Sequence, residues 1–391
     1  YCTNIHPGES LEAVRAALAH FLPDIKRQLA PERPFGLGLR LSAMAAEVLA
    51  EPRQFAAFAD FLAELGVCVF TLNGFPYGSF HDTRVKEQVY APDWSTFERL
   101  AYTNRLAELL ARFLPEEGEG SISTVPGTFR PLAAETARVE AIVTNLLRAA
   151  AHLVDLERRC GRQIALALEP EPFCMLESTG EAVQFFEERL LRRTSLAEFA
   201  RFADLSRHAA EEALRRHLGL CFDVCHAAVG FEEVEESLDW LERRGIAVPK
   251  LQLSAALRLS PVTPDSAAQL QPFADAVYLH QVVARTPSGR LCRYLDLDAA
   301  WAALAAGAEA EEWRIHFHVP IFLAELAPPL FTTQDVLLRV VDRHRKRPVS
   351  RHLEVETYSF SVLPPEWRQE ELAAAVVREL LWARNQLRPQ P

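Results

Sequence analysis

Residues 220–226 read Leu-Cys-Phe-Asp-Val-Cys-His and combine a strand-like alternation with chemically active side chains. Successive side chains of a strand point to opposite faces, so Phe222 faces one way while Asp223 and Cys225 face the other. In a parallel α/β barrel, helices cover the outside of each strand and the inside is normally packed with apolar side chains. A polar inner face therefore indicates a functional site inside such a barrel.

Strand-like runs recur along the whole chain, and helical stretches separate most of them. The runs end near residues 42, 73, 125, 169, 223, 254, 319 and 357. The clearest helical pattern covers about residues 132–159, where apolar residues return at spacings of three and four. Eight strand–helix units predict an α/β protein with a closed (β/α)8 TIM barrel. A doubly wound open sheet is the alternative, but no phosphate-binding glycine pattern follows any strand.

Two regions exceed a minimal barrel, within what we expect to be a single domain over residues 1–391. Residues 1–35 form an N-terminal extension that is either a leading strand or a lid over one barrel mouth. Residues 256–297 contain two strand-like runs around a Pro-Ser-Gly turn, which predicts a β-hairpin insertion.

The composition narrows the class of protein. Its 391 residues are 49% hydrophobic and 24% charged, as in soluble globular proteins. A net charge of −11 argues against a nucleic-acid partner. Seven scattered cysteines favour a reducing compartment, and no apolar run is long enough to span a membrane. We therefore expect a soluble cytoplasmic protein.

Inward-facing polar residues gather near the C-terminal ends of several predicted strands, where barrel enzymes carry their chemistry. The set comprises Glu169, Glu171, Asp223, Gln252, His316, His318, Glu354 and Glu356. Buried charges are normally paired or bound to metal. The pattern favours a metal or substrate site, and the alternative is an antiparallel sheet with one solvated face.

Three of these segments resemble the xylose-isomerase-like TIM barrels, a superfamily that includes sugar isomerases, ketose 3-epimerases and endonuclease IV. They are Ala-Leu-Glu-Pro at 167–170, Cys-Phe-Asp-Val-Cys-His at 221–226 and Leu-Glu-Val-Glu-Thr-Tyr at 353–358. The superfamily's metal site takes a Glu, an Asp, a His and a Glu from successive strands, which implies Glu169, Asp223 and Glu356 here. Gln252 stands where the superfamily usually has the His.

Further segments resemble EboE, the metabolite traffic branch of that superfamily. They are residues 3–9, 35–42, 71–81, 250–257, 316–322 and 352–360. The EboE family is associated with bacterial and algal gene clusters that move secondary metabolites. The resemblance implies a small-molecule metabolite as ligand and partners encoded in the same gene cluster.

The expected cofactor is one divalent metal ion, with Mn, Zn and Mg as alternatives. The predicted ligands are Glu169, Asp223, Glu356 and His318, with Gln252 as the competing fourth ligand, since a Gln carbonyl suits Mg²⁺ or Mn²⁺ better than Zn²⁺. Loss of the metal altogether is the other possibility. The candidate substrate-binding residues are His226, His6, Asn73, Arg40 and His81.

Two functions follow from this site. The first is a metal-dependent sugar isomerase or epimerase acting on a small polyhydroxylated metabolite, in which Glu169 and Glu356 exchange a proton with the substrate as base and acid. The second is a non-catalytic barrel that binds or carries a metabolite in the same pocket, a reading that Gln252 favours. An abasic-site endonuclease would need more histidine ligands and a basic surface.

Overall fold

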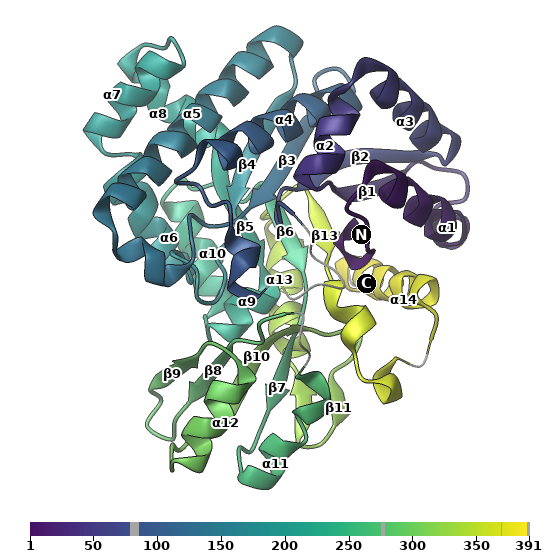
Figure 1. Cartoon of the computed structure of the whole chain (residues 1–391), viewed down its shortest axis with the longest axis vertical. Helices are drawn as coiled ribbons and strands as arrows, with labels where there is room; N and C mark the ends of the chain where they lie inside the picture. Colours follow the sequence, from purple (N-terminus) through teal and green to yellow (C-terminus); the bar gives the residue numbers. More distant parts are fainter. Residues whose placement is uncertain (79–85, 275–277, 369, 389–391) are drawn as a thin grey trace.

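Seven parallel strands form the centre of the protein in a computed structural model that describes residues 1–78, 86–274, 278–368 and 370–388 (Figure 1). The strands pair in the order β1-β2-β3-β4-β5-β6-β13. Their bounds are β1 Phe35–Arg40, β2 Val67–Asn73, β3 Glu119–Thr124, β4 Gln163–Leu168, β5 Leu218–Asp223, β6 Lys250–Leu253 and β13 Leu353–Val355. The sheet curves into a barrel with helices between its strands, which confirms the predicted fold class.

The N-terminal segment closes the barrel between its first and last strands. Cys2 forms a parallel bridge with Gly38 of β1, and its N–H donates to the carbonyl oxygen of Val355 in β13 at 3.1 Å. Tyr1 accepts a bond at 3.1 Å from the N–H of Gly38. Cys2 therefore lies between β1 and β13 as an isolated bridge residue, at the place that a leading strand would take.

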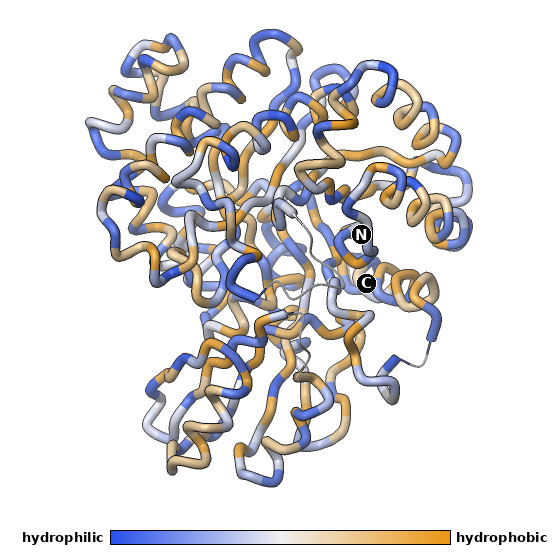
Figure 2. Tube along the Cα trace, viewed as in Figure 1, coloured by the Kyte–Doolittle hydropathy of each residue, from blue (hydrophilic) through white to orange (hydrophobic). Residues whose placement is uncertain are grey.

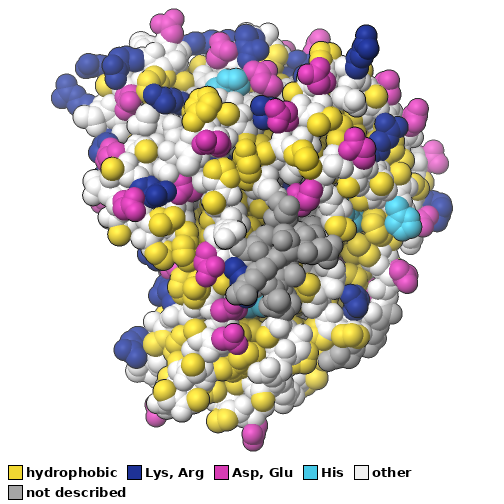
Figure 3. All heavy atoms as spheres, in the orientation of Figure 1, with side chains coloured by type: hydrophobic (Ala, Val, Ile, Leu, Met, Phe, Trp, Pro, Cys, Tyr) yellow, Lys and Arg dark blue, Asp and Glu magenta, His cyan; other side chains and the backbone are white. Residues whose placement is uncertain are grey.

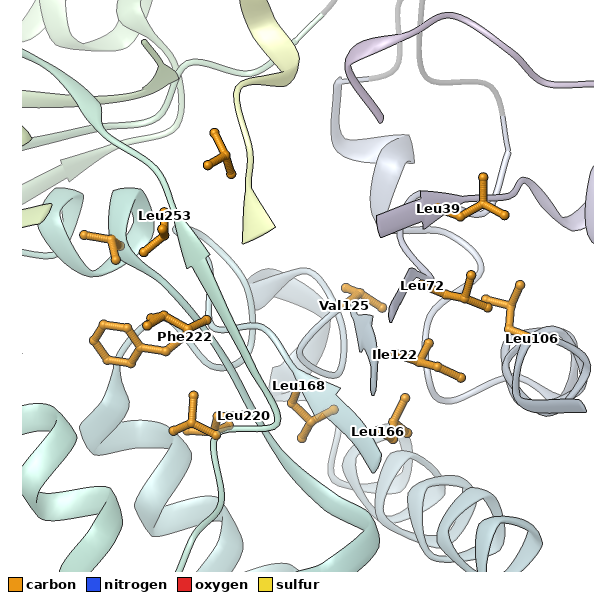
Figure 4. Close-up of a cluster of buried hydrophobic side chains, with 14 of the residues drawn as sticks. Leu39, Leu72, Leu106, Ile122, Val125, Leu166, Leu168, Leu220, Phe222 and Leu253 are labelled. Atoms are coloured by element: carbon orange, nitrogen blue, oxygen red, sulfur yellow. The ribbon is translucent and has the colours of Figure 1, made fainter. Parts of the chain in front are cut away.

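The outer helices cover the apolar face of the strands. They are α1 Leu11–Leu29, α2 Ala43–Ala50, α3 Pro52–Glu64, α4 Phe97–Phe113, α5 Thr136–Cys160, α6 Thr179–Phe185, α7 Arg193–Phe202, α8 Arg207–His217, α9 Val224–Val229, α10 Val234–Arg243, α13 Gln334–Lys346 and α14 Leu372–Leu387. Figure 4 shows Leu166, Leu168 and Phe222 among the buried apolar side chains. Figure 2 shows hydrophilic and hydrophobic residues alternating along the outer helices, as burial of one helical face requires.

Shorter helical turns lie mostly in the loops. They are η1 Thr3–Ile5, η2 Lys86–Tyr90, η3 Arg130–Ala134, η4 Phe186–Leu190, η5 Gln271–Phe273, η6 Tyr358–Val362 and η7 Pro365–Trp367. No helix in the described residues combines the length and apolarity that crossing a bilayer requires. Acidic and basic side chains are interspersed on the face shown in Figure 3.

A second, antiparallel sheet lies beside the barrel, in the lower part of Figure 1. Its six strands pair in the order β11-β12-β7-β10-β8-β9. The elements of this region are β7 Ala256–Leu259, α11 Pro264–Ala268, β8 Val282–Arg285, β9 Leu291–Tyr294, α12 Leu297–Ala305, β10 Glu312–His318, β11 Glu325–Ala327 and β12 Leu330–Thr332. Strands β8 and β9 pair antiparallel, which confirms the predicted hairpin.

The prediction that the run ending near residue 319 is a barrel strand is wrong. That run is β10, which pairs antiparallel with β7 and β8. The reason lies upstream, because only Ser254 and Ala255 separate β6 from β7. A parallel neighbour needs a crossover of a dozen or more residues, so the chain leaves the barrel at this point. Strand β10 then pairs within the antiparallel sheet, between β7 and β8.

The barrel interior holds a buried ion pair below the strand ends. Lys250 of β6 lies 2.5 Å from Glu354 of β13, and both side chains are at most 1% exposed. The Lys250 ammonium also donates to the hydroxyl of Ser123 at 3.3 Å. A Cβ atom on Gly38 would lie 1.4 Å from the Glu354 Oε1, so the glycine leaves the room that this carboxylate occupies.

Candidate metal centre

Three carboxylates converge at the C-terminal ends of barrel strands. Asp223 is the last residue of β5, while Glu169 and Glu356 directly follow β4 and β13. Each offers an oxygen within 4.8 Å of the other two, and all three side chains are buried. The three carboxylates that the alternation directs inward therefore lie together.

Hydrogen bonds orient two of these carboxylates and leave oxygens free. Asp223 Oδ1 accepts from the backbone N–H of His226 and from the Ser254 hydroxyl, both at 2.9 Å, so Asp223 also caps α9. Glu356 Oε1 accepts from the side-chain amides of Asn4 and Asn73. Among the described residues, nothing bonds to Asp223 Oδ2 or Glu169 Oε2. Unsatisfied buried oxygens of this kind fit a cation.

The pKa shifts of the three carboxyl groups also favour a bound cation. Burial raises the pKa of Glu169 well above its usual range, and the negative charge of Asp223 raises it further. Burial and the charges of Glu169 and Asp223 do the same to the pKa of Glu356. Burial alone would raise the pKa of Asp223, but His226, His318 and the hydrogen bonds it accepts bring it below its usual value. Three carboxylates this close repel one another unless a cation lies between them.

Two buried histidines extend the cluster through Asp223. Asp223, His226 and His318 offer ligand atoms within 4.8 Å of one another. The Nδ1 of His318 lies 2.9 Å from the Glu356 carbonyl oxygen, and that of His226 lies 3.1 Å from the Pro170 carbonyl oxygen. A carbonyl oxygen only accepts, so each Nδ1 carries the proton and each Nε2 keeps its lone pair. Burial lowers the pKa of His226 to about 4, which keeps that ring neutral and suited to metal binding.

Gln252 lies beside Asp223 on β6, to which β5 pairs in parallel register. Its Oε1 accepts from the Cys221 thiol at 3.0 Å, and its buried Nε2 has no partner among the described residues. A half-turn of the amide would exchange the two atoms and present the oxygen instead. Both predicted candidates for the fourth ligand, His318 and Gln252, therefore remain candidates.

A cavity of about 50 Å³ adjoins the carboxylates, which is room for a few water molecules. Glu169, Glu356 and His226 lie on its lining with Asn4 and Asn73. The rest of the lining is aromatic, apolar or hydrogen-bonding and comprises Phe75, Pro76, Lys86, Val89, Tyr90, Glu171, Tyr278, Leu279, Gln281, His316 and Tyr358. The lining of the cavity therefore combines possible metal ligands with aromatic and apolar side chains.

A second polar network spans this cavity from the barrel to the antiparallel sheet. The Tyr90 hydroxyl donates to Glu171 Oε1 at 3.1 Å, and the Gln281 amide donates to the Tyr90 oxygen at 3.0 Å. His316 bonds through Nδ1 to Gln281 Oε1 at 2.9 Å. Burial raises the pKa of Glu171 to about 8. Sequence patterns indicated Glu171 and His316 by their inward parity, but Tyr90 and Gln281 carry no such signal because they lie outside the strands.

The predicted substrate-binding residues separate into two groups. His226 and Asn73 lie on the cavity, as expected. Arg40 does not, because its guanidinium forms two bonds of 3.1 Å with Glu9 and one of 2.6 Å with the Gly78 carbonyl. His6 stacks on Phe21 with ring centroids 4.4 Å apart and also lies away from this cavity. The Arg40 bonds fasten the N-terminal segment to β1, and His81 lies outside the described residues.

Comparisons with known proteins identify no family. No family model matches the chain, and no curated protein matches it, so the resemblance to EboE has no support from them. Similar solved structures include the IOLI protein with a bound zinc atom, at 12% identity and a TM-score of 0.45, covering 99% of this chain and 96% of that one. The 3-keto-D-glucoside 4-epimerase YcjR from E. coli has 13% identity and a TM-score of 0.44, with coverage of 97% and 95%.

A xylose isomerase domain protein from Planctomyces limnophilus is also similar, at 14% identity and a TM-score of 0.46, covering 90% of this chain and 89% of that one. Inferences about the ligands and activity of this chain therefore rest on its own residues.

Proposed function

We propose that this protein is a metal-dependent isomerase or epimerase that acts on a small polyhydroxylated metabolite. The observation that carries the proposal is the convergence of Glu169, Asp223 and Glu356, with two unsatisfied buried oxygens, beside a cavity. A carboxylate cluster without a cation would be held in the fold at a cost of several kcal/mol per uncompensated charge. A bound divalent ion would compensate these charges and could take part in catalysis.

Glu169, Asp223 and Glu356 would hold the ion, with His318 or Gln252 as the fourth ligand. Carboxylate oxygens suit Mg²⁺ and Mn²⁺, and a histidine nitrogen adds affinity for Zn²⁺. When bound, such an ion polarises a substrate carbonyl and stabilises the negative charge that develops on its oxygen.

Glu169 and Glu356 would carry out the proton transfer as base and acid. Glu169 and Glu356 come from strands on different sides of the barrel and both lie on the cavity, so a substrate carbon between them can lose a proton to one and regain it from the other. Asn4 and Asn73 hold Glu356 by one oxygen, Oε1. That leaves Oε2 for the ion or the proton. His226 and the tyrosines of the lining supply hydrogen bonds to substrate hydroxyls.

A non-catalytic metabolite carrier is the second candidate, and Gln252 favours it. The residue replaces a nitrogen ligand with an amide on β6, which weakens binding of zinc in particular. A carrier would bind a ligand in the same cavity, with or without the ion, and without proton exchange.

The first test is the metal content of Asp223→Asn beside wild type, each purified without chelators. Wild type should contain bound Mn, Zn or Mg, and the variant should lose the carboxylate-bound equivalent because Asp223 belongs to both ligand groups around the cluster. Asp93→Asn is the matched control, since Asp93 is also buried and also accepts from a nearby backbone N–H, that of Ser95. It should keep its metal.

Proton exchange then separates the two functions. Metal-loaded protein is incubated in deuterated water with a panel of ketoses, cyclic polyols and their keto derivatives, and incorporation of deuterium at carbon is followed by NMR. An isomerase or epimerase exchanges a substrate C–H, and Glu356→Gln should abolish the exchange. Ligand binding with no exchange across the panel supports the carrier. Wild-type protein that binds no divalent ion contradicts the isomerase and leaves the carrier.

A further inference from the structure

A group of three ligand atoms on α9 and β10 converges beside the carboxylates, and it includes His318, which is also a candidate for the first site. The thiol of Cys225, in the first turn of α9, and ring nitrogens of His316 and His318 lie within 4.8 Å of one another. His316 and His318 are two residues apart on β10, so both project from the same face of that strand. All three are buried, with exposures of 0%, 4% and 0%.

The hydrogen bonds of the two imidazoles match those of metal-binding histidines. The Nδ1 of His318 bonds to the carbonyl oxygen of Glu356, and that of His316 bonds to Gln281 Oε1, both at 2.9 Å. Each ring thus has one nitrogen held by an oxygen acceptor. The Nε2 atoms of both rings are buried and have no partner in the part of the chain that the structure describes. Histidines that bind metal through one nitrogen almost always donate the other N–H to such an oxygen.

We propose that Cys225, His316 and His318 form a second metal site, selective for a thiophilic ion of the Zn²⁺ class. A thiolate and two imidazoles match the ligands that zinc prefers, whereas the neighbouring three carboxylates match harder ions. His316 lies on the cavity, which gives an ion a route in and leaves a position open to solvent or ligand. On binding, the thiol loses its proton to solvent as the metal–sulfur bond forms, and no electron transfer is involved.

The charge of such a site is compatible with its surroundings. One thiolate and two neutral imidazoles leave a divalent ion with a net charge of +1. Cys225 itself packs with Val229, Ala256 and Val283, which offer no compensation. Asp223 does, because its carboxylate lies within 4.8 Å of the His318 ring nitrogen. The two sites therefore adjoin at Asp223 without sharing that carboxylate as a required ligand of the second ion.

Assignment of His318 to this site has a consequence for the first one. A single Nε2 lone pair binds one ion, and the Nδ1 of His318 is already engaged with Glu356. When the second site is filled, the carboxylate-bound ion must take its fourth ligand elsewhere, and Gln252 is the predicted candidate that remains. The proposal itself does not require turnover and stands apart from the proposed enzymatic function.

The test uses Co²⁺ as a spectroscopic substitute for zinc. The whole protein is stripped with a chelator and titrated with two equivalents of Co²⁺. Coordination by a thiolate produces a sulfur-to-cobalt charge-transfer absorption in the near ultraviolet, which carboxylate and imidazole ligands do not give. The expected result is this band in wild type, its loss in Cys225→Ser and in His316→Ala, and its retention in Cys221→Ser. Cys221 is the matched control because it is equally buried but bonds to Gln252.

Glu356→Gln separates the two sites. It should weaken binding of the carboxylate-held ion and leave the thiolate band in place, so failure of the proposed function and failure of this inference give different results. The inference is overturned by wild type that binds Co²⁺ without the band, by a band that survives Cys225→Ser, or by its loss in Glu356→Gln. Should Cys225→Ser not fold, X-ray absorption of zinc-loaded wild type decides, since the inference requires a sulfur neighbour at about 2.3 Å.

Discussion

Replacement of Lys250 by Met removes the cation from the ion pair inside the barrel. Lys250 and Glu354 are both at most 1% exposed and lie 2.5 Å apart, so neither charge reaches water once its partner is gone. Removal of one member of a buried pair costs about 3–5 kcal/mol, because the remaining charge stays uncompensated or must take up a proton. Such a loss is a large part of the ~5–15 kcal/mol that stabilises a typical protein.

The double variant Lys250→Met/Glu354→Met isolates the electrostatic part of that loss. With both charges gone, apolar side chains of similar size fill the same space, and the unfolding free energy should return to within about 1 kcal/mol of wild type or exceed it. Urea unfolding followed by circular dichroism measures all three proteins. Arg27→Ala is the surface control, since its bridge to Asp24 is 71% and 56% exposed and contributes under about 1 kcal/mol.

Two results would refute this reasoning. A loss below about 1 kcal/mol in Lys250→Met would mean that the glutamate adapts at little cost, contrary to the burial of the pair. A double variant as unstable as the single one would mean that the lysine chain, and not its charge, stabilises the barrel.

Three further changes test other features. Gly38→Ala places a Cβ 1.4 Å from Glu354 Oε1. The clash should lower the unfolding free energy by several kcal/mol in the same urea assay. An unchanged unfolding free energy would mean that the carboxylate moves aside. Arg40→Ala removes the two bonds to Glu9 and should cost about 2–4 kcal/mol in thermal unfolding with unchanged metal content, whereas a changed metal content would return Arg40 to the site. Burial raises the pKa of Glu379 to about 7 from 4.5; the folded state therefore holds this proton more tightly, and stability falls as pH rises through that window. Relative to Glu379→Gln, wild type should lose about 2 kcal/mol between pH 5 and pH 7.5, and parallel pH profiles of the two would contradict this.

The barrel and its three carboxylates could be predicted because both depend on local alternation. Asp223 lies opposite Phe222 along its strand, and one side of a barrel strand is always covered by helices, so burial of one parity directs the other inward. The same logic wrongly took β10 for a barrel strand, although His318 still offers a ring nitrogen within 4.8 Å of Asp223. Alternation in β10 is identical in a parallel barrel and in an antiparallel sheet, and the distinction lay in the two-residue connection before β7.

Long-range partners could not be predicted. Arg40 has inward parity, yet its long side chain turns to Glu9, a residue that the packing of α1 brings alongside. The place of Gln281 depends on how the antiparallel sheet sits against the barrel, and Tyr90 lies in a short turn without strand or helix periodicity. A pattern of spacing records which face a side chain occupies, whereas such contacts depend on the packing of whole elements.

The pairing of residues 1–5 with β13 constrains the order in which the barrel folds. Cys2 bonds to Val355, and Asn4 bonds to Glu356 across 352 positions of sequence. Residues 1–5 therefore pair with β13 only once the chain between them is ordered, and only then does the barrel close and Glu356 become oriented. Such distant pairings form slowly because the intervening chain must be ordered first. A chain in which residues 353–356 have not yet folded would present the unpaired edge of β1 to other molecules and lack one of the three converging carboxylates, so the carboxylate cluster forms late in folding.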